Sequence, residues 1–256
     1  MVRKILVLSL LATSLAAASA YAQTAPPGAA KPAANAVDPA AIEALKNMGA
    51  YLLTLRRFEV STELTGEKVL ADGQKLQHTA TAEMDVERPN KIHVVMKSAR
   101  TQRQLVYDGK TISLYTPAQK VYGTLAFNGT LDKLINLLEE KYGMQIPLED
   151  LFRFGTPDAP LDKFESAMYA GQDFIDNDLC DHYAFRQDKI DWQIWIATGS
   201  KPLPRKVVIN NRADEARPQS VHMIDWNLKP TFKDTTFKFA APKGSSKIEI
   251  VPVKAQ

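Results

Sequence analysis

Stretches of helical period alternate along the chain with stretches of strand period. Asp38-Pro39 has the composition of a helix start, with an N-cap followed by proline at the first helical position. Apolar residues then recur at helical spacing, which predicts an amphipathic helix of about four turns. They are Ile42, Leu45, Met48, Leu52 and Leu55, and the helix is expected to end near the last of these.

From residue 58 onward the period changes to two. In residues 75–87 the even positions, from Leu76 to Val86, are mostly apolar, and the odd positions are all polar. Alternation of this length predicts a long strand with one face in water. Residues 58–66 alternate in the same way, and Asp72-Gly73 between the two runs predicts a hairpin.

Helical period returns once in the middle of the chain. Leu131, Leu134, Ile135, Leu138 and Tyr142 form an apolar stripe that Gly143 can end, and Pro147 begins a further short turn. Strand patterns resume from about Phe164. Short sequential connections favour an α+β fold, in which amphipathic helices cover a strongly curved antiparallel sheet of about 10–11 strands, an incomplete barrel.

The N-terminal segment predicts export. Arg3 and Lys4 precede an apolar run that ends in the small-residue pattern Ala20-Tyr21-Ala22, so residues 1–22 are expected to be a cleaved signal peptide. We expect no membrane span in the mature chain and no lipid anchor, because no cysteine follows the cleavage point. Residues 23–37 are rich in Ala and Pro and predict a disordered leader, and residues 38–256 predict a single domain.

Charge and composition exclude several functions. The formal charge of +3 includes Arg3 and Lys4, so the mature chain lacks the basic excess that nucleic acid binding needs. Cys180 is the only cysteine, which excludes an internal disulfide framework. No metal site and no cofactor are expected, because no phosphate-binding motif occurs and the histidines lack metal-ligand spacing. These are His78, His93, His182 and His222.

Cys180 and His182 could form a nucleophile and base pair. On a strand their side chains would share a face with Cβ atoms about 6–7 Å apart, which is awkward for direct contact. No glycine elbow or helix N-terminus nearby would lower the pKa of the thiol. We therefore predict that Cys180 is a small buried apolar residue and that the chain is not an enzyme, with an envelope hydrolase as the weakest alternative.

Apolar residues gather on the faces of the predicted sheet. Trp192 faces one side of its strand and Trp195 the other, so the concave side can hold an apolar ligand and the convex side can form contacts. A fully packed core is the alternative, because periodicity does not distinguish a filled barrel from a hollow one. The candidate ligand-binding residues are Leu76, Met84, Val86, Leu105, Tyr107, Leu134, Leu138, Tyr183, Phe185, Trp192, Ile194 and Trp226.

Two motifs carry a resemblance to a known family. Arg88-Pro89-Asn90 precedes one strand, and residues 108–111, Asp-Gly-Lys-Thr, lead into another that ends in Tyr115-Thr116-Pro117. In this order they resemble the LolA-like periplasmic carriers of outer-membrane lipoproteins. The whole chain also resembles a family of predicted periplasmic proteins related to those carriers.

The resemblance implies a periplasmic half-barrel, closed by helices, whose apolar side takes up acyl chains. It also implies that Arg88 holds the lid helices by hydrogen bonds, as five guanidinium donors could do. The expected function is a carrier or binding protein for a lipid, an acylated protein or another amphiphile, with an inner-membrane or outer-membrane partner. The alternative is an envelope scaffold or chaperone that acts through its convex surface around Trp195 and residues 202–206.

Overall fold

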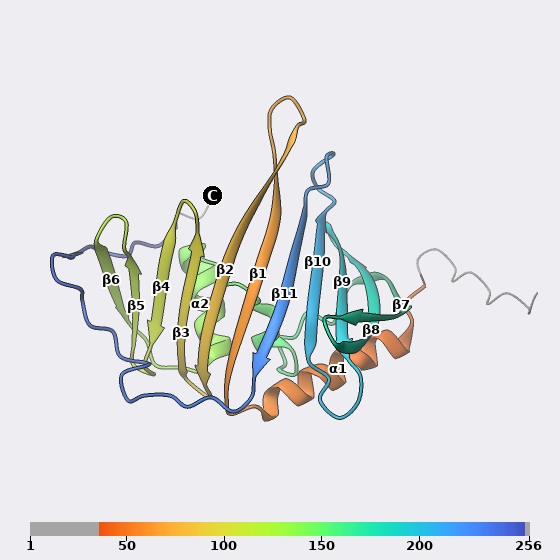
Figure 1. Ribbon diagram of the computed structural model, residues 1–256, viewed down its shortest axis with the longest axis horizontal. Helices are drawn as coiled ribbons and strands as arrows, with labels where there is room; N and C mark the ends of the chain where they lie inside the picture. The colour runs from red at the N-terminus through yellow and green to blue at the C-terminus, as the bar shows by residue number, and fades with distance from the viewer. Residues whose placement is uncertain (1–35, 254–256) are drawn as a thin grey trace, which may run out of the picture. The chain divides into compact units, whose positions relative to one another are not determined.

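The computed structural model describes residues 36–253, and one open sheet is the main element of the fold (Figure 1). The predicted signal peptide and most of the predicted leader lie outside these residues. The sheet has twelve strands in the order β12-β6-β5-β4-β3-β2-β1-β11-β10-β9-β8-β7. Because β12 and β7 are edges, the sheet does not close on itself.

The strands follow one another as the alternating sequence predicts. The first half holds β1 (Arg57–Val69), β2 (Lys75–Glu87), β3 (Lys91–Ser98), β4 (Gln102–Tyr107), β5 (Thr111–Thr116) and β6 (Val121–Ala126). The second half holds β7 (Phe164–Ile175), β8 (Asp178–Gln187), β9 (Ile190–Ala197), β10 (Pro204–Asn211) and β11 (Gln219–Asn227). Neighbours in these runs are antiparallel, as predicted.

The strand number is higher than the 10–11 expected from the sequence. The addition is β12 (Ser246–Lys247), which pairs in parallel with Val121 and Tyr122 of β6. A two-residue strand is too short to show any alternation, so the sequence pattern could not reveal it.

Strand β1 lies in the middle of the sheet and joins its two halves. It pairs with β2 on one side and with β11 on the other, from Glu59↔Asn227 to Gly66↔Ser220. The predicted turn at Asp72-Gly73 is present, and Gly73 has φ 85, which glycine adopts without strain. Beyond Gly66 and Ala80 the two strands pair only with each other and extend past their neighbours (Figure 1).

The three predicted helical segments are α1 (Pro39–Thr54), α2 (Leu131–Tyr142) and α3 (Asp150–Arg153). Asp38 caps α1, since its side chain accepts a hydrogen bond from the Ala40 amide at 2.9 Å. Gly143, with φ 60, ends α2. Val37, the last residue of the predicted disordered leader, forms a parallel bridge with Ala167 of β7, so that prediction is wrong at this residue.

The helices contribute to two apolar clusters with the strands. Buried residues of α2 pack in the first cluster with β1 to β5, and those of α1 pack in the second with β8 and β9. We call this face of the sheet the helix side. Leu55, Leu148, Val207, Trp226 and Leu228 contact both clusters, so the clusters form one continuous apolar layer.

A third, smaller cluster lies on the opposite face of β8, β9 and β10 and contains Cys180, Trp195 and Val208. Trp195 is 6% exposed and stacks on His182, with ring centroids 4.0 Å apart. Its indole N–H donates to Asp173 at 2.7 Å. The two tryptophans therefore face opposite sides as predicted, but Trp195 is not the exposed contact residue that the convex-surface hypothesis requires.

The C-terminal segment runs past the strand ends from β11 to the β6 edge (Figure 1). Phe239 packs against Tyr115 and Tyr122. The Ile248 amide donates to the Tyr122 carbonyl at 2.8 Å, and Ile250 packs over Gly123. This segment covers the free edge that β6 would otherwise present.

Candidate functional site

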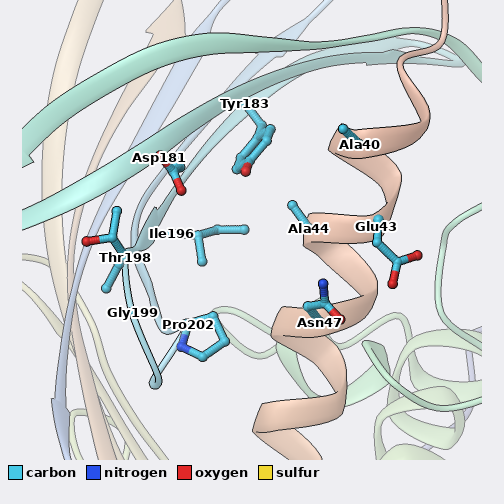
Figure 2. A pocket seen from close by; sticks show the side chains of 11 residues that line it. Ala40, Glu43, Ala44, Asn47, Asp181, Tyr183, Ile196, Thr198, Gly199 and Pro202 are labelled. Atoms are coloured by element: carbon cyan, nitrogen blue, oxygen red, sulfur yellow. The ribbon is translucent and has the colours of Figure 1, made fainter.

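A groove of about 500 Å³ separates α1 from strands β8 and β9. Figure 2 shows α1 on one side, with Ala40 and Ala44 turned toward the opening, and Ile196 of β9 opposite. Ala40 and Ala44 are four residues apart and so share one face of the helix. Because both side chains are small, this part of α1 leaves the space open.

The floor of the groove belongs to the protein core. Ile196 is 4% exposed and is a member of the cluster that joins α1 to β8 and β9. The turn after β9, with Pro202, closes one end. An apolar group that enters the groove would therefore contact the buried layer directly.

The rim of the groove is polar, and none of the described residues that line it is a lysine or arginine. Asp181 of β8 accepts hydrogen bonds from the Gln172 amide at 2.9 Å and the Tyr169 hydroxyl at 3.4 Å. Burial, and then the charge of Asp181, raise the pKa of Tyr183, so this phenol stays neutral. An apolar floor with a neutral and acidic rim can orient an amphiphile without any reactive group.

The structure places most of the predicted ligand-binding residues in the apolar layer. Trp226 contacts both clusters, and Tyr183 contacts the second cluster and also lines the groove. The others are buried members of the two clusters, on strands or, for Leu134 and Leu138, on α2 itself. In the first cluster these are Met84, Val86, Leu105, Tyr107, Leu134 and Leu138, and in the second Phe185, Trp192 and Ile194.

Leu76 lies apart from the other predicted ligand-binding residues. Its side chain is 43% exposed, and it lies where β2 pairs only with β1. Alternation predicts which face a side chain lies on, but it does not predict whether another element covers that face at that point along the strand. Leu76 therefore does not belong to the apolar layer.

Arg88 lies in the connection from β2 to β3, close to α2 and α3. Its guanidinium carbon is 5.7 Å from the centroid of the Phe152 ring, and the neighbouring Pro89 carbonyl accepts from the first amide of α2, that of Leu131, at 3.0 Å. Its Nε atom is buried and has no hydrogen-bond partner. Arg88 thus lies beside the helices, and its role in holding them stays a prediction.

An acidic cluster at the junction of α2 and α3 was not predicted. Arg153 of α3 pairs with Glu139 of α2 and with Asp150, and its Nε donates to Asn136 at 3.2 Å. Burial raises the pKa of the adjacent Glu149 to about 7, and the charges of Glu139 and Asp150 act in the same direction. The acidic residues between positions 139 and 150 can be read from the sequence, but only the fold places them around Arg153.

Cys180 is fully buried, as predicted. Its Sγ lies 3.5 Å from the carbonyl oxygen of Asp178, and burial raises the pKa of the thiol. A protonated, buried thiol is a poor nucleophile. Within residues 36–253, no group of three or more His, Cys, Asp or Glu residues is placed to hold a metal ion, and no helix has the length and apolarity to cross a membrane.

Residues 41–251 match a family described as predicted periplasmic protein, DUF2092. The chain belongs to this family. The match covers every element from α1 to β12 and confirms the periplasmic location that the sequence predicted. No curated protein matched this DUF2092 chain.

Several solved structures are distantly similar to this DUF2092 protein. Lipoprotein LppX from Mycobacterium tuberculosis is 15% identical with a TM-score of 0.49, and the match covers 77% of this chain and 100% of that one. LprF from Mycobacterium bovis is 12% identical with a TM-score of 0.46, over 78% and 98% of the two chains. A LolA superfamily protein from Nitrosomonas europaea is 10% identical with a TM-score of 0.36, over 78% and 97%. None of these likenesses is close enough to assign a function.

Proposed function

We propose that this DUF2092 protein is a periplasmic, non-catalytic binding or carrier protein for an amphiphile such as a lipid or the acyl chain of a lipoprotein. The groove beside α1 carries the proposal, because its floor at Ile196 is continuous with the buried apolar layer. An apolar chain bound there gains about 25 cal/mol for each Å² of apolar surface removed from water, before ordering costs. Affinity of this origin needs no reactive residue.

The helices can act as a movable cover over the helix side. Main-chain hydrogen bonds tie them to neighbouring segments near their ends, at Asp38 to Ala167 for α1 and at Leu131 to Pro89 for α2. Most of the buried contacts between these helices and the sheet are apolar side chains, which are non-directional. A shift of the helices would open the predicted site residues, such as Met84 and Tyr107, to a longer chain.

Purification without detergent tests the proposal directly. We expect organic extracts of the protein to contain a reproducible lipid by mass spectrometry, and we expect the protein to bind a fluorescent long-chain fatty acid. Ala44→Trp fills the groove and should weaken this binding by about tenfold or more, a loss of about 1.4 kcal/mol. Ala50→Trp, at an exposed position of the same helix, is the matched control and should bind as the wild type does.

Two outcomes would reject the proposal. One is a protein that is reproducibly empty and also fails to bind the fluorescent fatty acid. The other is equal loss of binding in Ala44→Trp and Ala50→Trp, which would trace the effect to damage of α1 instead of to the groove.

A further inference from the structure

Arg88 is a partly buried cation without an anionic partner. Its guanidinium lies over the Phe152 ring, its Nε is buried and unbonded, and no ion pair joins it to a carboxylate of the described residues. Burial lowers its pKa, Asp132 opposes this effect, and Arg56 adds to it. A guanidinium keeps its charge in proteins, so this charge stays in place.

The other partly buried arginines of the sheet and helices are paired. The side chain of Arg153 is 16% exposed and pairs with Glu139 and Asp150. That of Arg205 is 13% exposed and pairs with Asp178 and Asp225, both at 3.1 Å. A partly buried charge without an ion pair is unfavourable, and among the partly buried arginines of the described residues this holds for Arg88.

The neighbouring helix end also favours an anion. Thr130, the N-cap of α2, makes no side-chain capping hydrogen bond. The amide of Leu131, in the first turn, donates to the Pro89 carbonyl. The positive end of the helix dipole favours negative charge at this point, which Asp132 in the first turn supplies in part, and Arg56 contributes a further positive charge nearby. Asp132, in the first turn of α2, acts on Arg88 through its charge, but the two side chains form no ion pair in the described residues.

Arg88 and the groove lie toward opposite ends of α1. The Arg88 amide donates to the Arg56 carbonyl just beyond the helix, whereas Ala44 lines the groove. With a rise of about 1.5 Å per residue, the part of α1 from Ala44 to its last residue, Thr54, is about 15 Å long. This is the length scale of a long acyl chain, and the apolar layer fills the interval.

We infer that Arg88 binds the anionic head group, a carboxylate or a phosphate, of an amphiphile whose apolar chain runs along α1 toward the groove. The inference rests on the proposed function and names the class of ligand. The planar guanidinium can donate two parallel hydrogen bonds to either kind of head group. The ligand would supply the partner that Arg88 lacks.

The test compares three probes of equal chain length: a fluorescent fatty acid, its uncharged methyl ester and the corresponding alkyl phosphate. Wild-type protein should bind at least one of the two anionic probes about tenfold more tightly than the ester, as charge-assisted hydrogen bonds predict. Arg88→Gln should bind all three with the affinity of the ester. Arg88→Lys keeps the charge and loses the planar fork, so it should show an intermediate preference for the anionic probes. Arg103→Gln, at an exposed strand position, is the control and should keep the full wild-type preference.

Thermal melting separates this role from a structural one. Without ligand, Arg88→Gln should melt at the same temperature as the wild type or higher, because it removes an unpaired charge. A lower melting temperature of Arg88→Gln together with an unchanged preference for the anionic probes over the ester would overturn the inference and favour the lid-holding role. Equal wild-type affinity for both anionic probes and the ester would overturn the inference alone, whereas failure to bind any probe would overturn the proposed function.

Discussion

Gly49 of α1 and Gly155, just after α3, meet backbone to backbone. A Cβ atom on Gly49 would lie 2.5 Å from the Gly155 nitrogen, and one on Gly155 would lie 2.6 Å from the Gly49 carbonyl oxygen. Gly155 also has φ +83, which other residues adopt only with strain. No side chain fits between the two helical segments at this point, so the glycines set how closely α1 and α3 approach.

Gly49→Ala should therefore destabilise the protein. Alanine has the higher helix propensity by about 1 kcal/mol, but the clash with Gly155 should outweigh this and lower the free energy of unfolding by about 1 to 3 kcal/mol. Denaturant unfolding followed by circular dichroism measures the change. Asn47→Ala, at an exposed position of the same helix, tests propensity alone and should leave stability equal or higher; a Gly49→Ala protein as stable as wild type would contradict the close contact.

Tyr107 holds the turn that leads into α2. Its buried hydroxyl donates to the Gly129 carbonyl at 2.7 Å and accepts from the Gly129 amide at 3.0 Å. Tyr107→Phe keeps the ring and leaves both groups of Gly129 without that partner, so we expect a loss of about 1 to 3 kcal/mol in unfolding free energy. Tyr115→Phe, whose ring packs on Phe239, is the control and should change stability little.

Stability should fall as the pH rises from about 4.5 to about 7 because of Glu149. Burial raises its folded-state pKa to about 7, helped by Glu139 and Asp150 and opposed by Arg153 and a backbone hydrogen bond from Ile146. The folded state thus holds this proton more tightly than the unfolded chain does, so ionisation favours unfolding up to the folded pKa and adds nothing above it. After allowance for solvent screening, the loss should be about 1 kcal/mol.

Glu149→Gln should remove that part of the pH dependence and be the more stable protein at about pH 8. Thermal melting at about pH 5 and about pH 8 measures both effects. Glu140→Gln, at an exposed position of α2, is the matched control and should follow the wild-type pH profile. A Glu149→Gln profile identical to that of the wild type would contradict the assignment.

The Cys180 thiol should resist modification in the folded protein. It is 0% exposed, and burial raises its pKa, so both access and thiolate content are low. We expect a colourimetric thiol reagent to react slowly with native protein and rapidly and stoichiometrically in denaturant. Fast reaction of the native protein would mean that β8 opens locally at this position.

Local pattern was sufficient for the long strands and for the start of α1. Residues 75–87 alternate because one face of β2 is wet, and the observed strand has these bounds. The same rule separated Trp192 from Trp195, whereas the burial of Cys180 was predicted from the usual behaviour of free cysteines. Asp38-Pro39 identified the start of α1 because capping and proline geometry are properties of adjacent residues.

Features that depend on distant segments were not predicted. The groove forms only because Ala44 of α1 comes to lie opposite Ile196, and the contact of Gly49 with Gly155 likewise joins segments that are far apart in sequence. Leu76 has the same alternation as Met84, and only the position of the helices decides that one is exposed and the other buried. These features follow from tertiary packing, and the periodicity of the sequence carries no information about packing between distant segments.

Because β1 in the middle of the sheet pairs with β11, the sheet can be completed only late in export. Glu59 of β1 accepts a hydrogen bond from Asn227 of β11, a partner 168 residues later in the chain. During export the N-terminal end of the chain crosses the membrane first. One edge of β1 therefore stays unpaired until β11, Gln219–Asn227, has also crossed. Such non-local pairing makes folding slow and leaves an unpaired strand edge exposed meanwhile. Premature termination before β11 would therefore yield an aggregation-prone fragment and no smaller folded domain.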